Sequence, residues 1–185
     1  MGILIEGEVF RGSQQFAGEF GHTTVDPNGP PCGCGDQGCV EAYCSVPAVL
    51  GYIRSIPEQQ SPELAAMLSF RTPTIAELAN LAHHGDKAAL AAFARVGTYL
   101  GIGLANLVDL FNPDLIVLAG SMMAAREHFM PKLDQAVQKH GWKHSNRQIL
   151  VSQLGENGIG MGACGMVLQS IFNQDPVGVP ELMQA

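Results

Sequence analysis

The stretch Leu115-Ile116-Val117-Leu118-Ala119-Gly120 is a continuous apolar run that follows a turn signal at residues 112–114, Asn-Pro-Asp. A run without polar alternation is typical of a strand covered on both faces, as in a parallel sheet. Working outward, the pattern predicts helices over residues 87–111 and about 122–139, and a second short strand over 149–152. A last helix follows. This alternation of strands and helices predicts an α/β fold.

The first half of the chain is predicted to hold a hairpin, a long loop and shorter helices. Residues 3–10 place apolar arms on both sides of a Glu-Gly turn. Residues 11–31 are rich in Gly, Ser, Gln, Asn and Pro and indicate an extended loop. A helix is expected from residue 41 or 47 to about 55. Thr74 and Glu77 form the pattern of a capping box, which begins a further helix.

The long helix over residues 87–111 carries glycines at Gly97, Gly101 and Gly103, which weaken a helix intrinsically. We therefore expect another backbone to approach it closely at these positions. The residues assigned to its buried face share helical spacing: Leu90, Phe93, Gly97, Leu100, Leu104 and Phe111.

Composition restricts the function classes. The chain has 185 residues, 46% hydrophobic and 15% charged, as expected of one globular domain. A net charge of −7 and only ten Lys and Arg, with no basic run, argue against a nucleic-acid-binding surface. No signal peptide is visible, and polar residues interrupt the apolar stretch over 99–120, so no membrane partner is expected. We expect a cytoplasmic protein.

The segment Cys32-Gly33-Cys34-Gly35-Asp36-Gln37-Gly38-Cys39 places three thiols within eight residues, with glycines that allow a tight fold around one ion. Zn²⁺ prefers four such ligands in a tetrahedron. His22 is the nearest upstream candidate for the fourth ligand and Cys44 the nearest downstream one. His22 is favoured because Cys44 is predicted to lie in the following helix. Free cysteines in a flexible loop, or a strained Cys32–Cys34 disulfide, are the alternatives.

Four protein ligands leave no open position for water, so the zinc is expected to be structural. Two further features are assigned from the pattern alone. The glycines of residues 158–162 resemble a phosphate loop, although helix packing is the favoured interpretation. Cys164 stands among small residues at the start of an apolar helix and is expected to be a core residue.

The segments Gly18-Glu19-Phe20-Gly21-His22 and Cys32 to Ala42 together resemble the signature of the ROK family (repressors, open reading frames and sugar kinases). The match includes Glu, Gly-His, Cys-x-Cys-Gly and Gly-Cys-x-Glu in order and at family spacing. Residues 112–120 resemble the family's Asn-Pro segment. The resemblance covers the chain to about Asp175, so we expect a lobe over 1–175 and a tail over 176–185.

The resemblance implies an α/β lobe of the actin-like ATPase or ribonuclease H-like fold with an inserted zinc loop. It implies that His22, Cys32, Cys34 and Cys39 hold zinc. It also implies that Glu19, His22 and Glu41 contact the hydroxyls of a small-molecule sugar, and that the protein forms a homo-oligomer.

The chain departs from the family's pattern, and Ala119-Gly120 stands where kinases of the family often have Gly-Gly. The family's Asp-x-Gly-Gly phosphate-binding segment and the Asn-Asp pair that supplies a kinase base do not occur in it, so it resembles the second, C-terminal lobe alone. The primary hypothesis is a sugar-binding lobe of a ROK transcriptional regulator that makes no direct nucleic-acid contact itself. The alternative is the C-terminal lobe of an ATP-dependent, glucokinase-like sugar kinase, which would use ATP and Mg²⁺. A zinc-stabilised interaction module is the third hypothesis.

Overall fold

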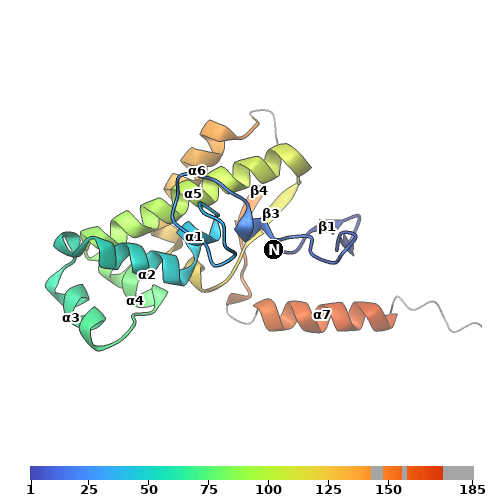
Figure 1. Ribbon diagram of the computed structural model, residues 1–185. Coiled ribbons are helices and arrows are strands. Elements are labelled where there is room, and N and C mark those ends of the chain that lie inside the picture. Colours follow the sequence, from blue (N-terminus) through green and yellow to red (C-terminus); the bar gives the residue numbers. More distant parts are fainter. Residues whose placement is uncertain (143–147, 156–157, 173–185) are drawn as a thin grey trace, which may run out of the picture.

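The computed structural model describes residues 1–142, 148–155 and 158–172, and helices α1, α2, α4 and α6 pack against the long helix α5 (Figure 1). The tail predicted over 176–185 lies outside the described residues. The elements in chain order are β1 Leu4–Ile5, β2 Glu8–Val9, η1 Phe20–His22, α1 Glu41–Cys44, α2 Val46–Ser55, η2 Pro57–Gln59, α3 Pro62–Phe70, α4 Ile75–His83, α5 Lys87–Phe111, β3 Leu115–Leu118, η3 Ser121–Ala125, α6 Arg126–His140, β4 Gln148–Val151 and α7 Gly158–Phe172.

Helix α5 is the centre of the core. The Asp86 side chain caps its first turn by accepting a hydrogen bond from the Ala89 N–H at 2.8 Å. Helix α6 packs along it so closely that a Cβ on Gly97 would overlap the Phe129 carbonyl oxygen. A Cβ on Gly101 would lie 2.6 Å from the Ala136 Cβ. The close approach of another backbone is therefore confirmed at Gly97 and Gly101, where the Leu133 carbonyl oxygen would lie 2.7 Å from the second Cβ. It is wrong at Gly103, where a Cβ would meet the side chains of Phe20 and Val40.

Two residues assigned to the buried face of α5 are exposed. Leu90 is 38% exposed and Phe111 is 51% exposed. Near the start of α5 the buried face is formed by Ala88, Ala89 and Ala92 instead, and near its end by Leu107 and Val108. The helix has the length and hydropathy of a membrane span, but 56% of that window is buried inside the protein, as expected of a core helix.

Strands β3 and β4 form the predicted parallel pair, with Leu115 opposite Gln148 and Leu118 opposite Val151. One face of the pair packs on the core through Ile116, Leu118 and Ile149. The expectation that both faces are covered is wrong for the described part of the chain. Alternation along the strands turns the other side chains outward, and they are about half exposed: Leu115, Val117 and Leu150.

Helix α7 lies apart from the body of the protein (Figure 1). It begins at Gly158, so the predicted glycine-rich loop is helical, and a Cβ on Gly160 or Gly162 would meet nothing within 4 Å. Neither a phosphate loop nor close packing is therefore seen at these glycines. Cys164 is exposed, and the prediction that it belongs to the core is wrong because its helix has no buried face there.

Several boundaries differ from the predicted ones. The helix expected to reach residue 55 is divided at Ser45, whose side chain caps α2. Helix α3 was missed, although Ser61 followed by Pro62 is an N-cap signal. The capping box that begins α4 is present as predicted. The hairpin β1–β2 is also confirmed.

Candidate metal centre

The loop that carries the cysteines is held by backbone pairing between its two arms. Thr24 and Cys39 form an isolated antiparallel bridge. The Val25 N–H donates to the Gly38 carbonyl at 2.8 Å. Gly38 has a φ of +69°, and a Cβ there would overlap the Asp26 carbonyl oxygen. The tight turn before Cys39 therefore requires glycine at this position.

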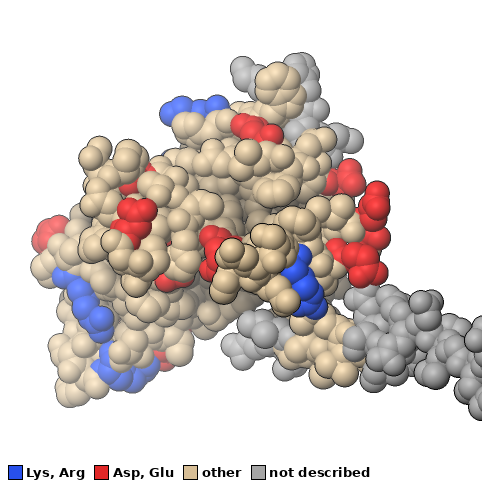
Figure 2. Space-filling model, turned by 45° about the vertical axis from the view of Figure 1, so that its right-hand side comes forward, with Lys and Arg blue, Asp and Glu red and all other residues tan. Residues whose placement is uncertain are grey.

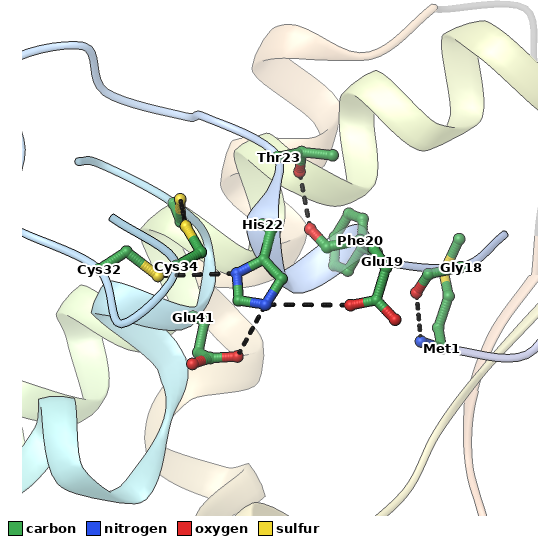
Figure 3. Close-up of polar contacts among 10 residues, drawn as sticks. Met1, Gly18, Glu19, Phe20, His22, Thr23, Cys32, Cys34 and Glu41 are labelled. Carbon is green, nitrogen blue, oxygen red and sulfur yellow. Dashed lines mark hydrogen bonds and ion pairs between the residues drawn. The ribbon is translucent and has the colours of Figure 1, made fainter. Parts of the chain in front are cut away.

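This folding brings the four predicted ligands together (Figure 3). Their ligand atoms, one nitrogen and three sulfurs, all lie within 4.8 Å of one another. The His22 Nδ1 is 3.6 Å from the Cys32 Sγ, and the Cys34 Sγ is 3.7 Å from the Cys39 Sγ. Zinc–ligand bonds of about 2.0 and 2.3 Å in a tetrahedron place such atoms about 3.5 to 3.8 Å apart. The spacing is therefore compatible with a zinc site.

The surroundings of the thiols differ. Cys39 is fully buried, and burial raises the pKa of its thiol to about 12, with the neighbouring cysteines adding to the effect. The pKa of the exposed Cys34 is lowered, first by a hydrogen bond from the backbone of Asp36. A buried thiol ionises readily only beside a cation, and coordination to a metal supplies that charge.

Cys44 lies outside this cluster. It is the last residue of α1, as predicted for a residue in the following helix, and its Sγ is 3.7 Å from the Val96 carbonyl oxygen. Burial raises the pKa of this thiol to about 12. Cys44 is therefore a packed helical residue, and the structure brings His22 to the cluster instead.

The second ring nitrogen of His22 points away from the sulfurs and toward two carboxylates (Figure 3). Its Nε2 lies 3.9 Å from the Glu19 Oε2 and 3.9 Å from the Glu41 Oε2. Glu19 precedes the 3-10 turn η1, and Glu41 is the first residue of α1. The three residues assigned to sugar contact are thus adjacent, with the side chains of Glu19 and Glu41 67% and 48% exposed.

The geometry suits a ligand with hydroxyl groups. At 3.9 Å neither carboxylate is hydrogen-bonded to the imidazole. A metal ion on Nδ1 would leave the proton on Nε2 and so fix the tautomer. The Nε2–H could then donate, and the two carboxylates could accept charge-assisted hydrogen bonds from hydroxyl donors.

Sequence reasoning missed the hollow beside this group. Glu19 and Phe20 line one side of a cavity of about 580 Å³, and Leu107 and Phe111 at the end of α5 line another. The cavity forms where the chain start, η1 and α5 meet. No local pattern indicates such a meeting of distant segments.

A second cavity, of about 520 Å³, lies beyond the carboxyl ends of the two parallel strands. It is lined by Gly120, Arg126, Val151 and Ser152, among others. Gly120 has a φ of +101° and turns the chain from β3 into η3. Ligands of open α/β sheets commonly bind at this edge, beyond the carboxyl ends of the strands.

Charged side chains do not form one basic surface. On the face drawn in Figure 2, Lys and Arg lie in several separate places, and most of the surface is uncharged. This agrees with the composition and offers no continuous site for a phosphate backbone on that face.

The fold and the site together define a mixed α/β lobe with a His-Cys₃ cluster compatible with zinc. The chain belongs to the ROK family, which it matches over residues 1–170. It is 32% identical over 175 residues to the xylose repressor of Bacillus subtilis (strain 168). It is 29% identical over 174 residues to the DNA-binding transcriptional dual regulator NagC of Escherichia coli (strain K12). These matches cover 94% and 93% of the chain, and the chain spans 42% of each regulator.

Solved structures of a ROK regulator and of a ROK kinase both resemble this chain. A ROK family transcriptional regulator, a homolog of the E. coli MLC protein, has a TM-score of 0.71 and 28% identity and covers 81% of this chain. A ROK family glucokinase from Streptomyces griseus, in complex with glucose and AMPPNP, has a TM-score of 0.72 and 29% identity and covers 89%. The chain spans 38% and 55% of these two proteins.

Proposed function

We propose that this chain is the sugar-binding lobe of a ROK-family transcriptional regulator, in which a structural zinc orders the sugar site. We assign residues 1–175 to this actin-like lobe. The observation that carries the proposal is the position of His22. One of its ring nitrogens belongs to the cysteine cluster, and the other lies 3.9 Å from each of two carboxylates.

The chemistry follows from that position. Bound zinc would fix the ring and its tautomer, as metal-bound histidines are oriented in other sites. Glu19 and Glu41 then accept hydrogen bonds from vicinal hydroxyls, and the His22 N–H donates to a hydroxyl oxygen. Sequence similarity to repressors named for xylose and regulators of the NagC type supports a sugar effector and a regulatory role.

A kinase lobe is the second candidate. The cavity beyond β3 and β4 favours it, since it lies at the edge where open α/β sheets bind ligands, and so does the likeness to a glucokinase solved with AMPPNP. Neither candidate predicts sugar phosphate from this chain alone, because the segment that supplies the kinase base does not occur in it. On our proposal the chain does not bind ATP with Mg²⁺ in a calorimetric titration, and such binding supports the kinase candidate instead.

Calorimetric titration of the zinc-loaded chain with xylose, glucose and N-acetylglucosamine tests the sugar site. Glu41→Gln removes a charged acceptor, so we expect sugar affinity to fall about tenfold or more while the zinc content is retained. Glu63→Gln, an exposed glutamate in the first turn of α3, is the matched control and should bind as the wild type does. Equal losses for both variants, or no sugar binding by a zinc-loaded wild type, would contradict the assignment.

A further inference from the structure

Outside the ligand set, one side-chain network joins the metal loop to the helices. The Tyr43 hydroxyl, on α1, donates to the Asp26 Oδ2 at 2.7 Å, although the two residues are 17 positions apart. The other carboxylate oxygen, Oδ1, accepts from the Asn28 N–H at 3.0 Å. These bonds, with that from Tyr43 first, lower the pKa of Asp26, so the carboxylate is charged at neutral pH.

The Tyr43 ring is itself fixed by the core. It is 3% exposed and stacks on Tyr99 of α5, with ring centroids 3.5 Å apart. The Arg95 guanidinium lies 4.5 Å from the Tyr43 ring centroid and 4.6 Å from that of Tyr52 on α2. Stacking and cation–π attraction therefore hold the phenol in one orientation.

The metal loop packs tightly on this phenol. A Cβ on Gly29 would overlap the Tyr43 hydroxyl and lie 2.7 Å from the Gly38 Cα. Gly38 directly precedes the ligand Cys39. The turn at residues 26–29, the phenol and the backbone next to a ligand are thus in mutual contact.

Helix α1 depends on such contacts. It has four residues and no side-chain hydrogen bond at its N-terminus. A helix this short is not stable by itself and takes its position from packing. The same helix carries Glu41, so whatever fixes α1 also fixes that carboxylate beside His22.

We propose that the Asp26–Tyr43 hydrogen bond is a positioning contact that assembles the four ligand atoms before a metal ion binds. The inference rests on the proposed zinc site. A loop that is already ordered loses less conformational freedom on binding, which raises its affinity for the ion. Asp26 and Tyr43 act through the loop and do not touch the ion.

The test measures Zn²⁺ affinity by competition with a chromophoric chelator, using the full chain. We expect Tyr43→Phe and Asp26→Asn each to weaken Zn²⁺ binding about tenfold. The double variant should bind within about twofold of the weaker single one, since both remove the same contact. Tyr52→Phe is the matched control. The Tyr52 ring also faces Arg95, but in the described part of the chain no hydrogen bond joins its hydroxyl to the metal loop. The Zn²⁺ affinity of Tyr52→Phe should therefore match that of the wild type.

Thermal unfolding of the metal-free variants separates positioning from general stability. A merely structural role would lower the melting temperature and leave the affinity of the folded protein unchanged, and that result would overturn the inference. Asp26→Asn keeps the side-chain volume and decides the question if Tyr43→Phe does not fold. A wild-type chain that binds no Zn²⁺ would contradict the proposed metal site itself. Zn²⁺ binding as tight as the wild type's by Asp26→Asn and Tyr43→Phe would overturn only the positioning role of these two residues.

Discussion

Gly38→Ala offers the sharpest perturbation of the metal loop, because the same loop contains a matched control in Gly35. Both glycines have positive φ, +69° at Gly38 and +97° at Gly35. A left-handed conformation costs an alanine about 1–2 kcal/mol at either position. Only at Gly38 would the new Cβ also overlap a backbone atom, the Asp26 carbonyl oxygen, whereas a Cβ on Gly35 would meet nothing within 4 Å.

Overpacking of this kind adds about 1–3 kcal/mol, so Gly38→Ala should cost about 2–5 kcal/mol and Gly35→Ala about 1–2. The difference corresponds to about 5- to 150-fold in an equilibrium constant. We expect it to appear mainly as weaker Zn²⁺ binding, because the overlap lies beside the ligand Cys39. Chelator competition measures the affinity, and unfolding curves with and without a chelator measure the stability.

Two outcomes for these variants would refute the reasoning about Gly38. If Gly38→Ala and Gly35→Ala weaken Zn²⁺ binding equally, the overlap with Asp26 has no consequence and the described loop geometry is wrong. A Gly38→Ala protein that binds zinc as tightly as the wild type contradicts the reasoning more directly.

Three further predictions concern the rest of the chain. Gly97→Ala should lower the free energy of unfolding by about 1–2 kcal/mol, because the overlap with α6 costs more than the gain in helix propensity. Gly51→Ala in α2, where a Cβ would meet nothing within 4 Å, should raise the free energy of unfolding by up to about 1 kcal/mol. Denaturant titration of both variants measures these changes. Arg71, 2.6 Å from Glu77, together with hydrogen bonds from Thr74, lowers the pKa of that carboxyl from 4.5 to about 2. The stabilisation by the ionised Glu77 carboxylate is therefore present above about pH 4.5 and is lost as the pH falls toward 2. The free energies of unfolding of wild type and Glu77→Gln should differ at pH 7 and converge as the pH falls toward 2. Cys44→Ser should leave the zinc content unchanged, and loss of zinc from that variant would show that the ligand set is misassigned.

The sequence predicted the metal cluster well because its information is local. Three cysteines within eight residues and one upstream histidine need only a tight turn to meet, and the glycines that allow it are visible in the chain. The parallel strand and the close contact at Gly97 were predictable for the same reason. A continuous apolar run and a glycine within a helix each have few structural explanations.

Features that depend on tertiary context were not predictable. Asp26 and Tyr43 carry no pattern that joins them, and their contact exists because Tyr99 and Arg95 of a distant helix fix the phenol ring. For Cys164, by contrast, burial was predicted and the structure shows an exposed side chain. Its apolar neighbours suggest burial, but the helix that carries it has no partner surface in the described part of the chain.

The most direct test of the central claim is the zinc content of the purified chain, measured by elemental analysis together with its fold. We predict about one zinc ion per chain, as four protein ligands require. His22→Ala and Cys34→Ser should lower that content and the melting temperature. A well-folded wild-type protein that contains no zinc, and gains no stability when Zn²⁺ is added, would contradict the assignment.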